Sequence, residues 1–343
     1  MKYIIIPEQR TIHQLPFYFA VEEYVARKYT NDDYFMAWRV EPTVMLGRNQ
    51  LIENEVNIDY CKRNNIHIFR RKSGGGCIYA DKGCMQFSYI SFAENVNSAF
   101  IEYMKSIAEM IKSLGINTEL SGRNDILVDG KKVAGSAFYR LKGRSVLHNS
   151  LLFSTQLEHL SQALTPGKEK LQSKGVASVR QRVTNVGTYT TLNIEAFMAY
   201  VRQYMCGNEV LELTPDDMQQ IAEIEKELAS DNFIYGKNPK YTEVRKKRFA
   251  DVGTIQAHIE LKNNKIVNIN LMGDYFLSGD LDNELLNLLH GVDFSREAVA
   301  NAIEGVEMGN VIRNFTTEQF LRLLFGRPPH VMKPDWLKIN LTS

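Results

Sequence analysis

The seven residues Arg70-Arg71-Lys72-Ser73-Gly74-Gly75-Gly76 constrain the fold most, because they join three cations to three glycines. Apolar runs at 66–69 and 77–79 flank them, and each run is typical of a β-strand. Glycine lacks a Cβ and lets backbone N–H groups approach a ligand, and arginine binds carboxylate or phosphate. The sequence therefore predicts an anion-binding connection between two strands. A polar turn whose cations are solvated is the alternative.

Composition excludes several classes of protein. Hydrophobic residues make up 44% of the 343 residues and charged residues 24%, which is typical of a soluble globular protein with two domains. The formal net charge of +1 gives no overall bias toward nucleic acid or a membrane. No apolar run is long enough to span a membrane, and the four cysteines contain no CxxC pair. We expect a cytoplasmic protein with reduced thiols.

The pattern of apolar residues predicts an α+β fold, because strands joined by hairpins dominate the first part of the chain. Helices are expected on one face of these strands. Residues 34–40 and 43–46 should pair as a hairpin around Glu41-Pro42, and residues 97–114 form the clearest amphipathic helix. We predict a catalytic domain at 1–235, a linker at 236–249 and a small α/β accessory domain at 250–343.

Three charged segments lie outside the glycine-rich connection. Residues 165–185 contain glycine, proline and many cations with little periodicity, which is typical of a lid or a binding loop. Arg245-Lys246-Lys247-Arg248 falls in the predicted linker and is expected to be solvated. Glu22-Glu23 also fits the solvated side of a helix at 16–29, although one of the pair could face a cleft.

Lys132 is a candidate for fixed positive charge in a cleft. It follows the Asp129-Gly130 turn on an apolar strand, and strand alternation places Lys131 on the opposite face. An exposed strand lysine is the alternative. Asn124-Asp125 could bind a nucleotide or a metal-bound phosphate, or could simply form a turn. His148 lies on an apolar strand, where a histidine is commonly a satisfied core residue.

Three segments in order resemble the motifs of lipoate–protein ligases. Residues 70–83 resemble the family's RRxSGGGxVxHDxG signature, and 122–125 with 132–137 resemble its GRND and KVSGSA segments. Residues 170–185 look like the family's adenylate-binding loop. Trp38 and Gly47-Arg48-Asn49-Gln50 also fall where the family has a tryptophan and a GRxQN-like turn. The resemblance covers the whole chain, including Gly273-Asp274-Tyr275-Phe276 in the accessory domain.

The resemblance implies the fold of the biotin/lipoate–protein ligases and a reaction in two steps. Lipoate attacks the α-phosphate of ATP to give lipoyl-AMP and pyrophosphate. The ε-amine of an acceptor lysine then attacks the acyl carbon and releases AMP. Acceptors would be the glycine-cleavage H protein or the E2 subunits of 2-oxoacid dehydrogenases, Mg²⁺ would accompany ATP, and the ligase would be a monomer.

The resemblance also assigns roles to residues of this chain. Lys132 would be the catalytic residue, bridging the carboxylate and the α-phosphate electrostatically, and Asp125 would lie near Mg²⁺. The lipoate-binding residues would be Trp38, Arg70, Ser73, Gly74, Gly75, Gly76 and His148. The residues binding ATP and the adenylate would be Arg70, Gly75, Tyr79, Asn124, Asp125, Lys132, Ser136, Ala137, Lys174, Ser178 and Val179.

One departure and two alternatives accompany the resemblance. The family has a histidine before its aspartate where this chain has Ala80-Asp81, so acyl or acceptor preference could differ. A related octanoyl- or lipoyl-transferase would need a cysteine nucleophile beside Lys132. No cysteine lies between Cys84 and Cys206, and the apolar neighbours of Cys77 and Cys84 predict buried, inert thiols. A non-catalytic lipoyl-domain binder would keep the fold without the chemistry.

Overall fold

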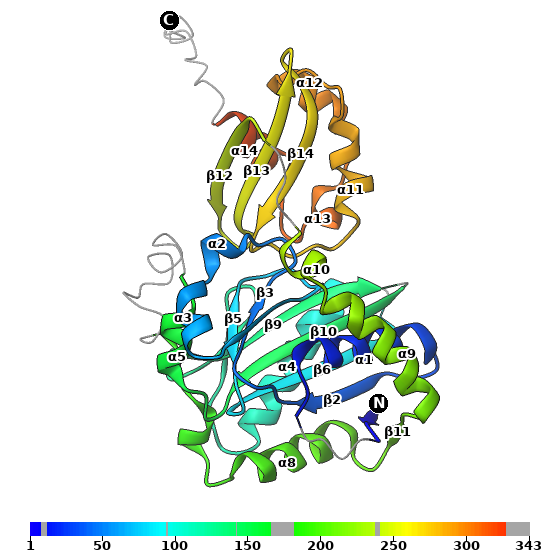
Figure 1. Cartoon of the computed structure of the whole chain (residues 1–343), viewed down its shortest axis with the longest axis vertical. Coiled ribbons are helices and arrows are strands. Elements are labelled where there is room, and N and C mark those ends of the chain that lie inside the picture. Colours follow the sequence, from blue (N-terminus) through cyan, green and yellow to red (C-terminus); the bar gives the residue numbers. More distant parts are fainter. Residues whose placement is uncertain (8–11, 94, 142, 166–181, 237–240, 327–343) are drawn as a thin grey trace, which may run out of the picture.

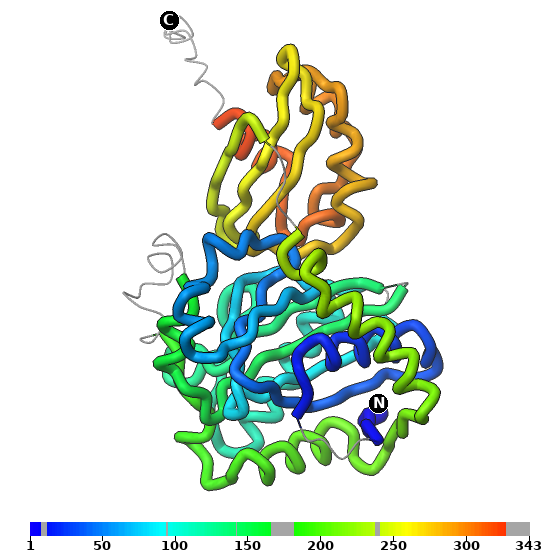
Figure 2. Tube along the Cα trace, viewed as in Figure 1, coloured from blue at the N-terminus to red at the C-terminus, as the bar shows by residue number. Residues whose placement is uncertain are grey.

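The computed structural model describes residues 1–7, 12–93, 95–141, 143–165, 182–236 and 241–326. A large N-terminal domain and a smaller C-terminal domain lie one above the other along the long axis of the molecule (Figure 1). The trace in Figure 2 shows residues 45–75, in blue, running up to the base of the C-terminal domain. No helix of the described residues combines the length and apolarity that a membrane span requires.

An eight-stranded mixed sheet forms the centre of the large domain. Its strand order is β11-β1-β2-β6-β10-β9-β8-β7; β1 runs parallel to β11 and β2, and the other pairs are antiparallel. The strands are β1 (Lys2–Ile5), β2 (Tyr34–Trp38), β6 (Cys84–Ser91), β7 (Glu119–Ser121), β8 (Asp125–Val128), β9 (Lys131–Leu141), β10 (Arg144–Leu152) and β11 (Val210–Glu212). This topology confirms the mixed, mostly antiparallel α+β fold.

Helices cover both faces of this sheet, so the prediction of helices on one face is wrong. On one face α1 (Leu15–Lys28) and α9 (Pro215–Leu228) pack with Trp38 in one apolar cluster. On the other face α4 (Val96–Lys112) and α8 (Ile194–Cys206) form a second cluster with Phe35. Successive side chains of a strand point to opposite faces, which is why β2 supplies both clusters. Thr214 begins α9 with a capping box closed by Asp217.

A second, three-stranded sheet carries the glycine-rich connection. It has β3 (Thr43–Leu46) between β4 (His67–Arg70), which is parallel to it, and β5 (Ile78–Ala80), which is antiparallel. The predicted hairpin of 34–40 with 43–46 is therefore wrong, since β2 belongs to the large sheet. Every residue of β2 and β3 is buried, and a continuous apolar run does not reveal which neighbour it pairs with. Four short helices of the large domain are α2 (Ile52–Glu55), α3 (Ile58–Arg63), α5 (Leu157–Ala163) and α10 (Asp231–Tyr235), of which α3 and α10 contact β4 and α5 contacts β5. The short helix η1 (Val186–Tyr189) packs instead against β10 of the large sheet.

The C-terminal domain is an antiparallel sheet covered on one face by helices. Its strands, in order, are β12 (Glu243–Phe249), β13 (Gly253–Lys262) and β14 (Lys265–Gly273). Its helices are α11 (Leu281–Glu284), η2 (Leu286–Leu289), α12 (Arg296–Ala302), α13 (Met308–Val311) and α14 (Thr317–Phe325). The linker predicted at 236–249 is wrong from Glu243 onward, because Arg245 to Arg248 pair with β13. On this edge strand charged side chains reach solvent, which hides the strand pattern in the sequence.

Residues 273–276 dock the C-terminal domain on the large domain. The Gly273 N–H donates to the carbonyl of Asn49 at 2.7 Å, and the Tyr275 carbonyl accepts from the Gly75 N–H at 3.0 Å. Phe276 is buried and stacks on Phe138, with ring centroids 5.4 Å apart. The two domains therefore meet at the glycine-rich connection itself.

Candidate active site

A cavity opens where the large sheet, the glycine-rich connection and the C-terminal domain meet. From the large domain it is lined by Phe19, Trp38, Met45, Arg71, Gly76, Cys77, Ile78, Gln86, Gly122, Arg123, Asn124, Asp125, Lys132, Gly135, Ser136, Ala137, His148, Asn149, Ser150 and Arg182. From the C-terminal domain it is lined by Arg248, Phe249, Asp251, Gly253 and Asp274. One end is aromatic and the other is rich in charge.

Lys132 faces this cavity, and Lys131 is exposed on the opposite side of β9, as strand alternation predicts. The Lys132 ammonium lies 2.8 Å from Oδ1 of Asp125, and Arg182 binds Oδ2 of the same carboxylate. Gly135 makes room for this arrangement, because a Cβ at that position would lie 2.5 Å from the Lys132 nitrogen. A buried carboxylate thus orients two cations at the cavity wall.

Asn124, Ser136 and Asn149 form a polar patch next to that carboxylate. The Asn124 amide donates to the Ser136 carbonyl at 2.8 Å, and Asn149 donates to the Ser136 hydroxyl at 2.8 Å. Oδ1 of Asn149 is buried and accepts no hydrogen bond from the described residues. The site therefore offers a buried acceptor to a ligand donor such as an amine or a hydroxyl. Asn149 is not among the predicted site residues, because it lies on an apolar strand that shows no motif.

The aromatic end is built on a buried polar chain. Trp38 donates from its indole N–H to Ser88 at 2.8 Å, and Ser88 donates to Glu22. Nδ1 of His148 lies 3.1 Å from the same Glu22 carboxylate, and Nε2 lies 2.7 Å from the Ser73 hydroxyl. Because the carboxylate must accept, the Nδ1–H of His148 donates to it, which fixes the imidazole orientation.

The expectation that Glu22-Glu23 is solvated is wrong, since both side chains are buried. All residues of α1 from Leu15 to Ala26 are buried, so this part of the helix has no solvated side. Glu23 forms ion pairs with Arg27 and Lys72. Buried carboxylates need such partners, and the sequence pattern could not show where they would come from.

Two of the three cations of the connection, Arg70 and Arg71, order the loop itself. Arg70 is buried, is absent from the cavity wall, and donates to the carbonyls of Gly47, Arg48, Gln50 and Ile234. Arg71 donates to the Ser73 hydroxyl and to the carbonyls of Met45, Gly74 and Gly76. In the structure Arg70 therefore lies away from the cavity where the sequence predicted it to bind lipoate and phosphate. The reason is that backbone carbonyls of a tight loop also need donors when they are buried.

The glycines meet the C-terminal domain more closely than the cavity. A Cβ on Gly74 would lie 2.2 Å from the Tyr275 carbonyl oxygen, and one on Gly75 would lie 2.8 Å from the Phe276 ring. Gly75 also has φ of +89°, which disfavours other residues. Only Gly76 of the three lines the cavity among the described residues. In this arrangement Gly74 and Gly75 allow the two domains to dock closely. The sequence pattern predicted instead that a ligand approaches these glycines closely.

Two further groups of predicted residues have different outcomes. Tyr79 is buried and does not line the cavity, whereas Ser136 and Ala137 do. Lys174, Ser178 and Val179, with most of the predicted 165–185 loop, lie outside the described residues. Cys77 lines the cavity and is half-buried, contrary to the expectation that it is buried. Burial raises the pKa of Cys84 to about 12, which makes that thiol a poor nucleophile.

Comparison with known proteins identifies the family. The family model for the lipoyl protein ligase A/B catalytic domain matches residues 15–206, and that for the bacterial lipoate protein ligase C-terminus matches 238–324. The chain is 34% identical to lipoate-protein ligase LplJ of Bacillus subtilis over 317 residues, covering 89% of this chain and 95% of that protein.

The chain belongs to the lipoate–protein ligase family. Its members are enzymes, and this lipoate–protein ligase has both domains of the family in sequence order.

Solved structures confirm the fold of this ligase. LipL1 of P. falciparum in complex with lipoate superimposes with a TM-score of 0.71 at 21% identity, covering 93% of this chain and 96% of that one. An archaeal bipartite lipoate protein ligase with its E2 lipoyl domain, from Thermoplasma acidophilum, superimposes with a TM-score of 0.59 at 24% identity, covering 71% of this chain and 98% of that one. A lipoate-protein ligase A bound with ATP superimposes with a TM-score of 0.59 at 24% identity, covering 68% of this chain and 98% of that one.

Proposed function

We propose that this ligase activates lipoate with ATP at the cavity around Lys132 and then transfers the lipoyl group to a lysine of an acceptor lipoyl domain. The observation that carries the proposal is that Lys132 lines one cavity together with the aromatic side chains of Trp38 and His148 and the polar side chains of Asn124 and Ser136. Relatives solved with lipoate and with ATP support the two substrates.

The first step brings together two anions, so it needs fixed positive charge. A lipoate carboxylate oxygen forms a bond to the α-phosphorus while the bond to the β-phosphate oxygen breaks, and pyrophosphate leaves with that electron pair. Lys132 and Arg182, oriented by Asp125, would offset the repulsion and stabilise the charge of the transition state. Lys132 acts here through its charge.

The acyl chain would lie at the aromatic end, beside Trp38 and His148. The Glu22 carboxylate fixes the imidazole of His148, which keeps that wall in one geometry. The nucleotide would lie along Asn124, Ser136 and Ala137, with the unpaired Oδ1 of Asn149 as an acceptor. Ala80 is buried and does not line the cavity.

The described residues contain no group of three or more His, Cys, Asp or Glu side chains that could hold a metal ion. Both oxygens of Asp125 already face Lys132 and Arg182. The residues present therefore do not fit a Mg²⁺ site of their own, and Asp125 as a metal ligand is not supported. We propose that Mg²⁺ enters with the triphosphate, bound mainly by phosphate oxygens, as is common for this ion.

Acceptor, assembly and location are further parts of the proposal. A solved ligase with its E2 lipoyl domain supports lipoyl domains as the acceptor class, within which we propose the H protein and E2 subunits. We propose a monomer, because residues of one chain line the cavity from both domains. A cytoplasmic location would suit an ATP-dependent enzyme whose cysteines form no disulfide with one another in the described part of the chain.

The experiment is release of pyrophosphate from ATP by purified protein with Mg²⁺, with and without lipoate and with no acceptor present. The proposal predicts lipoate-dependent pyrophosphate release in a burst, because the adenylate stays bound until an acceptor arrives. Absence of lipoate-dependent release in folded protein would contradict it. Chelation of Mg²⁺ should remove the burst.

A further inference from the structure

We propose that Arg123 and Arg248, one from each domain, form a binding site for the leaving pyrophosphate at the charged end of the cavity. The inference rests on the proposed adenylation and names residues for its leaving group. It also gives a function to Arg248, the last cation of the run 245–248, which the sequence pattern predicted to be solvated.

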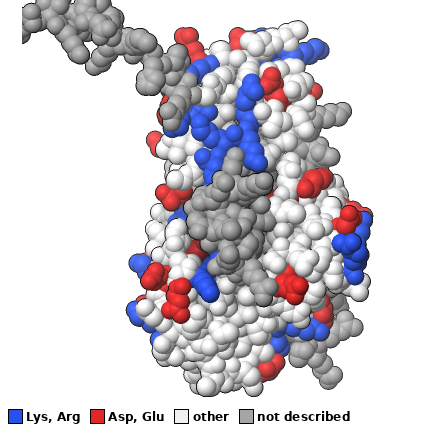
Figure 3. Space-filling view, turned by 90° about the vertical axis from the view of Figure 1, so that its left-hand side faces the viewer, with Lys and Arg blue, Asp and Glu red and all other residues white. Residues whose placement is uncertain are grey.

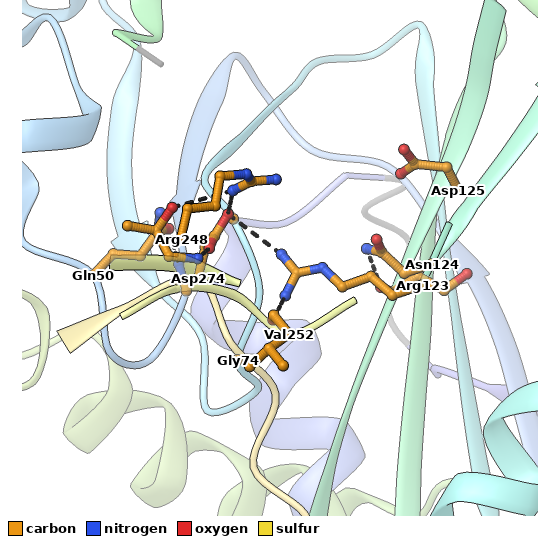
Figure 4. A network of polar contacts seen from close by, with 12 residues as sticks. Gln50, Gly74, Arg123, Asn124, Asp125, Arg248, Val252 and Asp274 are labelled. Atoms are coloured by element: carbon orange, nitrogen blue, oxygen red, sulfur yellow. Dashed lines mark hydrogen bonds and ion pairs between the residues drawn. The ribbon is translucent and has the colours of Figure 1, made fainter. Parts of the chain in front are cut away.

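The two arginines meet at one carboxylate (Figure 4). Arg123, in the turn between β7 and β8, donates to the Val252 carbonyl and lies 3.3 Å from Oδ2 of Asp274. Arg248, near the end of β12, lies 3.9 Å from the same oxygen and donates to Thr254 at 3.1 Å. Figure 4 shows both guanidinium groups turned toward Asp274, with Asp125 beyond Arg123.

This cluster has a surplus of positive charge. Two guanidinium groups share the one Asp274 carboxylate, and both side chains are mostly buried, with 13% and 22% of their surface exposed. Burial lowers the pKa of Arg123, and the nearby charge of Arg248 acts in the same direction. The described lining of the whole cavity has five Lys or Arg side chains and three carboxylates, and such a surplus, partly removed from water, favours an added anion.

The other cations of the cavity wall already have partners. Among the described residues that line the cavity, Arg71 holds carbonyls of its own loop, and Lys132 and Arg182 hold Asp125. Arg123 and Arg248 differ from these cations because the two guanidinium groups face the same carboxylate oxygen of Asp274. Arginine suits this role because its planar fork binds phosphate oxygens bidentately.

The chemistry of the step also favours this end of the cavity. In a phosphoryl displacement the attacking and leaving oxygens lie roughly in line through the phosphorus. The carboxylate arrives from the aromatic end at Trp38 and His148, so the leaving group departs from the far side of the α-phosphate. The C-terminal domain closes the charged end with Arg248, Asp251 and Asp274.

Other cations of β12 continue away from the cavity. Figure 3 shows Lys and Arg side chains gathered on the C-terminal domain on one face of the molecule. Lys246 is exposed, lies on the same face of β12 as Arg248 and does not line the cavity. It therefore provides a matched control, because it has the same charge in the same strand.

The test is calorimetric titration of the full-length protein with inorganic pyrophosphate, without ATP or lipoate. We expect Arg248→Gln and Arg123→Gln each to weaken pyrophosphate binding about tenfold to a hundredfold, the loss of a charge-assisted hydrogen bond. Lys246→Gln should bind like the wild type. Asp274→Asn should bind pyrophosphate as tightly or more tightly, because it removes a competing negative charge and its amide oxygen can still accept from Thr254.

The opposite results would overturn the proposal. If the arginines only latch the domains together, Asp274→Asn will weaken pyrophosphate binding as much as Arg248→Gln does, through loss of domain docking. Wild-type affinity in both arginine variants would also refute the site. Thermal unfolding of each variant confirms that the titrated protein is folded. Because this titration measures binding alone, it is independent of whether lipoate-dependent pyrophosphate release is observed.

Discussion

Replacement of Lys132 by methionine tests the centre of the proposed chemistry. Methionine keeps an unbranched side chain of similar length and removes the charge. In the structure, the Lys132 ammonium lies 2.8 Å from Asp125, and Arg182 binds the other oxygen of that carboxylate. The variant therefore leaves Asp125 paired and removes one of the two cations that would face the α-phosphate.

The magnitude follows from the electrostatics of a partly buried site. Lys132 is 19% exposed, so its interaction with a phosphate about 4 Å away is worth about 4 kcal/mol at an effective dielectric constant of about 20. Loss of most of it in the transition state lowers the rate of adenylation about 10²- to 10³-fold. The cost in folding stability is about 1 kcal/mol or less, because Arg182 still compensates the carboxylate.

The assay is the initial rate of lipoate-dependent pyrophosphate release, with thermal unfolding measured on the same samples. Lys131→Met is the matched control, since Lys131 is the exposed neighbour on the opposite face of β9 and should retain wild-type activity. Adenylation by Lys132→Met within about fivefold of the wild type would refute the electrostatic role. A large loss of stability, with activity lost in proportion, would show that Lys132 acts through folding instead.

Three further variants test other parts of the account. Cys77→Ser should keep pyrophosphate release and acyl transfer, whereas a transferase that forms a thioester at this cavity-lining cysteine would lose turnover. Gly74→Ala should loosen the domain interface and raise susceptibility to proteolysis between the domains, because its Cβ would lie 2.2 Å from the Tyr275 carbonyl oxygen; unchanged cleavage would contradict this. Burial alone would raise the pKa of Asp217, but hydrogen bonds, first among them that from Lys28, outweigh it and hold the pKa well below the usual range. Asp217→Asn should therefore cost about 2 kcal/mol of unfolding free energy at pH 7, and the difference should shrink as the pH falls below about 4; a cost independent of pH between 7 and 3 would refute it.

The sequence predicted the fold class and the position of Lys132 for physical reasons. The 97–114 pattern matched α4, and strand alternation correctly separated Lys132 from Lys131. The Asp129-Gly130 turn is present, with both residues at positive φ. These features are local, so a single stretch of sequence contains the information that sets them.

The failures concern contacts between distant segments. Arg70 is held by the carbonyl of Ile234, which lies 164 positions later, and no local pattern distinguishes such an arginine from one that binds a ligand. The burial of Glu22 depends on His148 and Ser88 from other strands. The contribution of the C-terminal domain to the cavity, through Asp274, could be anticipated only from the resemblance at residues 273–276.

The most direct test of the account is the intact mass of an acceptor lipoyl domain after incubation with the ligase and lipoate. One sample receives ATP with Mg²⁺, and the other receives an ATP analogue that cannot be cleaved between the α- and β-phosphates. We predict a mass gain of one lipoyl group on an acceptor lysine in the sample with ATP and Mg²⁺, and no gain in the sample with the analogue. A gain of the same size with the analogue, or acylation only from an acylated donor protein, would contradict ATP-dependent ligation and would favour the transferase.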